Sequence, residues 1–148
     1  MSQNIDDLKT KIEVELAKLP GEVGLFVKFL KSEKLVVKNE NTQFWAASVI
    51  KLPILVEFFK GVAEGSINPT SKIKVKTENI VKGSGIIHLL NEDLEFTLLD
   101  IAKLMIILSD NTATNELIDL LGTENVEKNM NSLGLKNTTL RHKMFIPA

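Results

Sequence analysis

Ser48 and Lys51 are a nucleophile and a base three residues apart, at the predicted start of a helix. Residues i and i+3 share one face of a helix, so the lysine amine lies within reach of the serine hydroxyl. An adjacent base activates a serine for attack. The helix dipole and the free N–H groups of a helix start also stabilise an oxyanion. Such a pair suits acyl transfer, with Ser48 as nucleophile.

The spacing of Ser48 and Lys51 does not carry this interpretation by itself. A second serine and lysine with the same spacing, Ser71 and Lys74, occur in a polar segment without a helical pattern. Ser48 differs in its setting, because it follows Phe44-Trp45-Ala46-Ala47 and heads an apolar helix. The alternative is that Ser48 only caps the helix and that Lys51 is solvated.

A second polar group, Ser109-Asp110-Asn111, follows a long apolar run. Serine, aspartate and asparagine are common helix caps, and another helical pattern begins at Thr112. Alone, this group would be interpreted as a cap. Together with Ser48 and Lys51, it gains a chemical meaning.

The two groups together resemble the S-x-x-K and S-D-N motifs of the class A β-lactamase and penicillin-recognising enzyme family. The resemblance runs from about Phe44 to Met144 and includes the less specific Gly83-Ser84-Gly85-Ile86. It implies a serine hydrolase that acts on a β-lactam or a related amide or ester, including peptide-like substrates. It implies neither a metal nor a cofactor.

The resemblance also implies roles for single residues. Ser48 is similar to the nucleophile that opens the β-lactam, and Lys51 to the base that accepts its proton. Ser109 is similar to the hydroxyl that passes a proton to the leaving nitrogen. Asn111 is similar to the amide that binds the side-chain carbonyl of the substrate. An amine in a dry cleft has its charged form disfavoured, which suits Lys51 to the role of base.

The third motif of the family, Lys-Thr-Gly, does not occur in these 148 residues. In the family its strand closes the cleft and supplies a second oxyanion N–H group. We therefore expect residues 1–148 to form a single partial domain of α+β (mixed α/β) class. In it, a helix and two strands precede a helical region, and the remainder of the antiparallel sheet is missing. A C-terminal fragment or a second chain would complete that sheet, and the apolar side chains of residues 23–30 should lack a core of their own.

Met144 falls where the resemblance places the glutamate that activates the hydrolytic water. Methionine cannot accept a proton, so an acyl-enzyme would persist or be hydrolysed slowly. One alternative is therefore a penicillin-binding acyl transferase or esterase of the same family. The other is a non-catalytic module for ligand sensing or protein interaction, in which the motif residues are caps.

Periodicity and turn residues predict the elements that position these side chains. Trp45, Phe58 and Phe59 are expected in the core. Thr97 is expected to cap the helix that carries the apolar run from Ile101 to Leu108. The remaining predictions are helices over 7–19, 48–64, 112–121 and 123–133, strands over 23–30 and 35–38, and an exposed strand over 72–76.

Composition excludes several functional classes. The chain is 44% hydrophobic and 25% charged with a net charge of −1, which is typical of a globular domain and offers no basic footprint for nucleic acid or a membrane surface. The absence of cysteine excludes a thiol nucleophile.

His88 and His142 do not indicate a Ser-His-Asp triad, because no G-x-S-x-G motif is present. The N-terminus lacks a signal-peptide pattern, so we expect a cytoplasmic protein, or a secreted one whose signal was removed.

Overall fold

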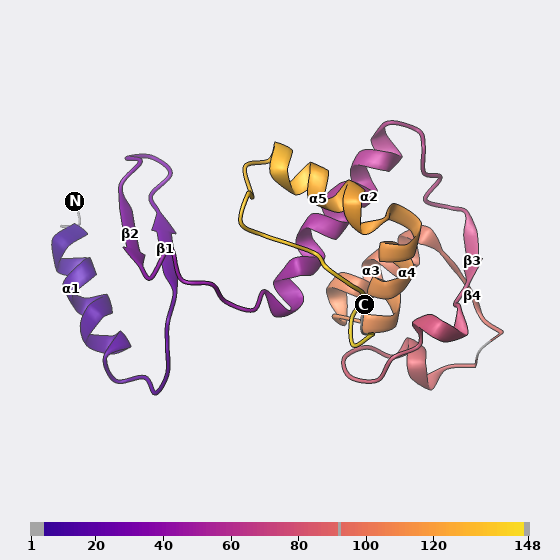
Figure 1. The fold of residues 1–148 in the computed structure, drawn as a ribbon, viewed down its shortest axis with the longest axis horizontal. Coiled ribbons are helices and arrows are strands. Elements are labelled where there is room, and N and C mark those ends of the chain that lie inside the picture. The colour runs from indigo at the N-terminus through magenta and orange to yellow at the C-terminus, as the bar shows by residue number, and fades with distance from the viewer. Residues whose placement is uncertain (1–4, 92, 147–148) are drawn as a thin grey trace. The chain divides into compact units, whose positions relative to one another are not determined.

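The computed structural model describes residues 5–91 and 93–146 (Figure 1). They form two compact units, one ending at Trp45 and the other beginning at Ala46. Together the described residues contain five α-helices and two strand pairs, so the mixed α+β class is confirmed.

The first unit consists of helix α1 (Ile5–Leu16) and the strands β1 (Leu25–Lys28) and β2 (Leu35–Lys38). The strands pair antiparallel, with Leu25 opposite Lys38, which confirms the predicted hairpin. Val36 is the one buried residue among those described in this unit. Phe26 and Leu30 are 65% and 83% exposed. A two-stranded sheet has no substantial core, as the sequence predicted for this segment.

The second unit is built around four helices, and all four were predicted. They are α2 (Lys51–Ala63), α3 (Leu98–Ile107), α4 (Asn111–Leu121) and α5 (Thr123–Ser132). Their apolar faces meet in a core that includes the fully buried Ile54, Phe58, Ile101, Met105, Leu117, Val126 and Met130. This core fixes the helix ends that carry the polar motifs.

Local signals account for where these helices begin and end. The Thr97 hydroxyl accepts a hydrogen bond from the Asp100 N–H, which confirms the predicted cap of α3. Gly122, with φ +76°, ends α4 and allows the chain to turn into α5. A short 3₁₀ helix, η1 (Ala47–Ile50), precedes α2. Pro53 is the third residue of α2 and so lies in its first turn, where proline is tolerated.

The predicted strand near residue 72 is shorter than expected and has a partner that the sequence did not indicate. It is β3 (Lys72–Lys74), paired antiparallel with β4 (Glu95–Thr97). Two further 3₁₀ turns, η2 (Thr77–Asn79) and η3 (Ile87–Leu89), lie in the long connection between them. The connection therefore returns the chain to the start of α3.

Two of the expected core aromatic residues are not in the core. Trp45 is 96% exposed and Phe59 is 48% exposed, whereas Phe58 is fully buried as predicted. Phe58 and Phe59 are consecutive in α2, so they point in different directions and only one of them faces the other helices. The buried ring of Phe58 and the half-exposed ring of Phe59 pack edge to face, with ring centroids 5.3 Å apart.

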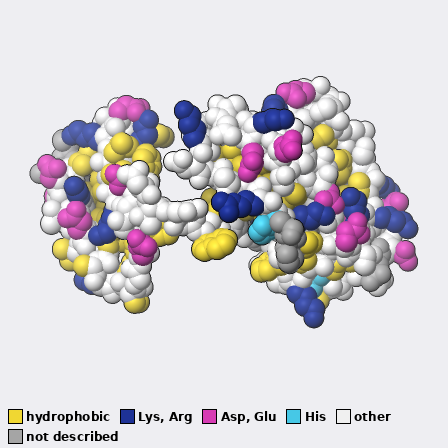
Figure 2. Space-filling model, in the orientation of Figure 1, with side chains coloured by type: hydrophobic (Ala, Val, Ile, Leu, Met, Phe, Trp, Pro, Cys, Tyr) yellow, Lys and Arg dark blue, Asp and Glu magenta, His cyan; other side chains and the backbone are white. Residues whose placement is uncertain are grey.

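The surface carries both signs of charge. On the face drawn in Figure 2, lysine and arginine side chains are interspersed with acidic ones and do not gather in one patch. Among residues 5–91 and 93–146, no helix has the length and apolar character to cross a membrane.

Candidate active site

Ser48 and Lys51 lie at the junction of η1 and α2, in contrasting environments. Ser48 is exposed, whereas Lys51 is only 2% exposed. The residue before the serine, Ala47, has φ +45°, an unfavourable conformation for a residue with a side chain. The chain thus accepts local strain where it presents the Ser48 hydroxyl.

Ser109 lies between α3 and α4, also in a left-handed conformation, with φ +52°. Its hydroxyl oxygen is 2.8 Å from the Ser48 hydroxyl oxygen and 3.0 Å from Lys51 Nζ. Lys51 Nζ also donates to the Ser109 carbonyl oxygen at 2.6 Å and to Asn111 Oδ1 at 2.9 Å. The structure therefore brings together all four residues that the sequence singled out.

The link from Ser48 to Lys51 differs from the direct contact that their spacing suggested. The three acceptors of the Lys51 amine belong to Ser109 and Asn111, and the Ser109 hydroxyl bridges the amine and Ser48. Lys51 donates to the Ser109 hydroxyl, and the Ser109 hydroxyl donates to Ser48. With Lys51 neutral, the same two contacts with their donors reversed are a continuous route for a proton from Ser48 to Lys51. The second motif thus completes the first.

Burial lowers the pKa of Lys51 below its ordinary value, because desolvation disfavours the ammonium form. The negative charge of Asp110 opposes this change, and its effect is the smaller of the two. The neutral amine, which is the form that accepts a proton, therefore forms more readily than in a solvated lysine.

A pocket of about 300 Å³ opens beside these groups. It combines apolar walls with the two hydroxyls and the amine, which is the composition of a small-molecule site. Its lining residues are Ser48, Val49, Lys51, Leu52, Met105, Ile106 and Ser109.

Asp110, to which the sequence gave no role beyond capping, is fully buried and holds the site together. Its Oδ1 accepts from the Ala113 N–H at 2.9 Å and caps α4. Its Oδ2 accepts from the N–H groups of Ile86 and Ile87, at 2.7 and 2.9 Å. A Cβ atom at Gly85 would lie 2.2 Å from the Asp110 carboxyl carbon, so this position requires glycine. Hydrogen bonds to Asp110 therefore hold the loop that contains Gly85 next to the turn that carries Ser109.

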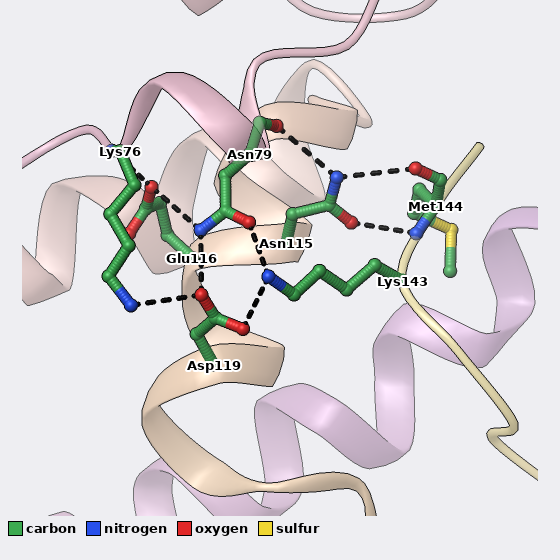
Figure 3. Close-up of polar contacts among 7 residues, drawn as sticks. All are labelled: Lys76, Asn79, Asn115, Glu116, Asp119, Lys143 and Met144. Carbon is green, nitrogen blue, oxygen red and sulfur yellow. Dashed lines mark hydrogen bonds and ion pairs between the residues drawn. The ribbon is translucent and has the colours of Figure 1, made fainter. Parts of the chain in front are cut away.

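Met144 lies in the C-terminal segment, and a side chain of α4 binds its backbone (Figure 3). The buried Asn115 accepts from the Met144 N–H at 2.7 Å and donates to the Met144 carbonyl oxygen at 3.2 Å. Asn115 is one helical turn beyond Asn111, so one helix contacts both the Lys51 amine and the backbone of Met144. The Met144 side chain packs against the core.

The histidines lie outside this constellation. The ring of the exposed His142 contacts the Lys143 carbonyl oxygen, and a buried nitrogen of His88 makes no hydrogen bond in the part of the chain that the structure describes. In the same described residues, no three histidine, aspartate or glutamate side chains form a group that could bind a metal ion.

Comparison with known proteins identifies the family. The profile of the β-lactamase enzyme family matches residues 7–148, and the chain belongs to this family. No curated protein sequence gives a significant match.

Solved structures of this family superpose closely on the chain. PBP-A matches with a TM-score of 0.86 and 32% identity, over 93% of this chain and 53% of its own. A β-lactamase from Sphaerobacter thermophilus matches with a TM-score of 0.85 and 33% identity, over 93% of this chain and 52% of its own. An ancestral class A β-lactamase, at 20% identity and a TM-score of 0.83 over 92% of this chain and 52% of its own, shares the fold. The chain thus spans about half the length of these proteins.

Proposed function

We propose that the protein is a β-lactamase-like serine hydrolase that forms an acyl-enzyme at Ser48 with a β-lactam or a related amide or ester. The observation that carries the proposal is the hydrogen-bonded chain from the Ser48 hydroxyl through Ser109 to the buried amine of Lys51. A mutant of the related PBP-A has been solved as an acyl-enzyme complex with penicillin G, which supports this substrate class.

In the proposed reaction, the Ser48 oxygen attacks the carbonyl carbon and its proton moves through the Ser109 hydroxyl to Lys51. The backbone N–H of Ser48 contributes one donor to the oxyanion. In a β-lactam or amide the carbon–nitrogen bond then breaks, and the proton returns through Ser109 to the leaving nitrogen. In an ester the carbon–oxygen bond breaks, and the same proton goes to the leaving oxygen. The Asn111 side-chain oxygen accepts from Lys51, and its amide nitrogen donates to the side-chain carbonyl of the substrate.

The second oxyanion donor and the remainder of the sheet would come from polypeptide outside these 148 residues, either as a C-terminal segment or as a second chain. The exposed Phe26 and Leu30 of the first unit and the half-length match to the related structures support this proposal. The described residues alone would be an incomplete catalyst.

Met144 favours slow release of the acyl group. Its backbone is bound by Asn115, and its thioether has no basicity with which to activate a water molecule. A penicillin-binding acyl transferase or esterase that keeps its acyl group is therefore a second candidate function. In a preparation complemented by the remainder of the sheet, both candidates predict a burst of about one equivalent of product followed by slow turnover.

The Met144→Glu variant tests this account of deacylation. It should speed the slow phase and leave the burst unchanged, because only the second step gains a base. Stopped-flow hydrolysis of a chromogenic cephalosporin measures both phases. Rapid steady-state hydrolysis without a burst in the unmodified protein would show that another residue activates the water.

A fluorescent penicillin separates the three readings of the site. Turnover indicates a lactamase, and a stable fluorescent band indicates a penicillin-binding acyl transferase or esterase. The absence of labelling, in the complemented protein as well, would favour the non-catalytic module in which Asp110 and its neighbours act only as caps.

A further inference from the structure

Five polar residues form a closed network on one side of α4, which we call the Asp119 network (Figure 3). Asp119 Oδ1 lies 2.6 Å from Lys143 Nζ, and Asp119 Oδ2 accepts from Lys76 Nζ and Asn79 Nδ2, both at 2.9 Å. Lys143 Nζ also donates to Asn79 Oδ1 at 2.6 Å. The fifth member, Glu116, accepts from Asn79 Nδ2 and from the Lys76 backbone N–H.

The network joins segments that are distant in sequence. Lys76 and Asn79 belong to the region of η2, Glu116 and Asp119 to α4, and Lys143 to the C-terminal segment. Lys143 is the residue immediately before Met144, whose backbone is bound by Asn115. Two adjacent residues of the C-terminal segment are thus attached to one helix, the first by charge and the second by an amide.

The pair of Lys143 and Asp119 is sheltered from water, unlike most ion pairs among the described residues. Its side chains are 23% and 21% exposed, and Asn79 beside them is fully buried. The pair of Lys74 and Asp93, by contrast, is 61% and 99% exposed. Exposed pairs contribute little to stability, whereas sheltered pairs with additional hydrogen bonds fix geometry. Burial raises the pKa of Asp119, but hydrogen bonds from Lys143, Asn79 and Lys76 outweigh it and lower that pKa to about 2.

We propose that Lys143 is a positioning residue: through Asp119 and Asn79 it fixes the backbone of residue 144 on α4 and so determines how effectively a side chain at that position promotes deacylation. The second part rests on the proposed function. The first part concerns only the attachment of the segment and does not depend on catalysis.

Lys76 provides a matched control. It donates to the same carboxylate as Lys143, but it attaches the region before η2 and not the C-terminal segment. Lys143→Met and Lys76→Met therefore each remove one cation from Asp119. Only the first should release residue 144. Lys143→Arg retains a cation and should restore the attachment.

The first measurement is hydrogen exchange at the Met144 amide, whose N–H is bound by Asn115. We expect Lys143→Met to increase its exchange rate at least about tenfold, with the wild-type rate in Lys76→Met and recovery in Lys143→Arg. Equal protection in Lys143→Met and wild type would overturn the proposal. So would equal loss of protection in both methionine variants, because it would indicate a general loss of stability.

The second measurement uses the Met144→Glu variant complemented by the remainder of the sheet. Adding Lys143→Met should slow deacylation at least about tenfold and leave the acylation burst unchanged, and adding Lys76→Met should alter neither. Unchanged deacylation would overturn the catalytic part of the proposal. If no variant is acylated, the proposed function fails, whereas the exchange experiment still decides whether Lys143 positions residue 144.

Discussion

At the scale of single residues, the site depends on a lysine that is buried yet fully hydrogen-bonded. The amine of Lys51 has three oxygen acceptors, two on Ser109 and one on Asn111. Burial of an unpaired ammonium group would be strongly unfavourable, so these acceptors explain how the fold tolerates it. Desolvation nevertheless lowers the pKa of Lys51. The burial that requires these acceptors therefore also makes the amine a better base near neutral pH.

Replacement of Lys51 tests its role as base. Lys51→Ala should slow acylation of Ser48 by roughly 10²–10⁴-fold, the usual effect of removing a positioned base. In the wild type, acylation should become faster as the pH rises and level off above the lowered pKa of Lys51, because only the neutral amine accepts a proton. The measurement is the rate of β-lactam labelling across pH. Lys74→Ala, in the second serine and lysine pair, is the control, and equal rates in the two variants would refute the role.

The sequence could identify Ser48, Lys51, Ser109 and Asn111 because their residue types and local spacing carry the chemical signal. It could not show that Ser109 bridges Ser48 and Lys51, since that contact joins residues 61 positions apart. The clamp of Asp110 on Ile86 and Ile87 is equally non-local. In the sequence, this contact corresponds only to the glycine at position 85, where the Asp110 carboxylate leaves no room for a side chain. The catalytic roles themselves stay predictions.

At the scale of elements, helices were easier to predict than strands. The helical patterns of α2 to α5 recur every three to four residues, and packing of their apolar faces stabilises the helices that the pattern predicts. β4 has only three residues, which is too short a run to predict a strand, and it forms because it pairs with β3. The prediction that Trp45 lies in the core was wrong, because residue type gives only a tendency toward burial. Whether a side chain is buried depends on the elements that pack around it.

Consecutive phenylalanines of α2 provide a test of this packing. Phe58→Ala should lower the free energy of unfolding by roughly 3–5 kcal/mol, because it leaves a cavity in the core. Phe59→Ala should cost about half of that or less, since Phe59 is already 48% exposed. Urea denaturation of the two variants measures the difference. Equal losses would contradict the orientation of α2 described above.

The attachment of the C-terminal segment to α4 predicts a dependence of stability on acid. The folded pKa of Asp119, about 2, lies below its ordinary value of 3.8. The interactions of the Asp119 carboxylate with Lys143, Asn79 and Lys76 together therefore stabilise the fold by about 2 kcal/mol at neutral pH, and this contribution is lost as the pH falls from about 4 to about 2.

Asp119→Asn should thus destabilise the protein at about pH 6 and have progressively less effect toward about pH 2. Urea denaturation at several pH values measures this change. The exposed Asp93→Asn is the control and should have little effect throughout. An Asp119→Asn effect that does not vary with pH would contradict the charge-based attachment.

At the scale of the whole molecule, the two units differ in how much of a core they possess. The second unit contains a continuous core of buried side chains, whereas Val36 alone is buried among the described residues of the first. On α2, the side chains of Leu52, Val56 and Phe59 are 54%, 45% and 48% exposed. These exposed apolar surfaces agree with a chain that spans about half of its related structures. That residues 1–148 belong to a single domain stays a prediction.

The most direct test of the account is the covalent modification of Ser48. After prolonged exposure to a β-lactam or a fluorophosphonate, intact-mass spectrometry should show one adduct, which peptide mapping places on Ser48. The adduct should disappear in Ser48→Ala and remain in Ser71→Ala, because Ser71 has the same spacing to a lysine but lacks the buried amine and the bridging Ser109. An adduct that persists in Ser48→Ala would contradict the central claim.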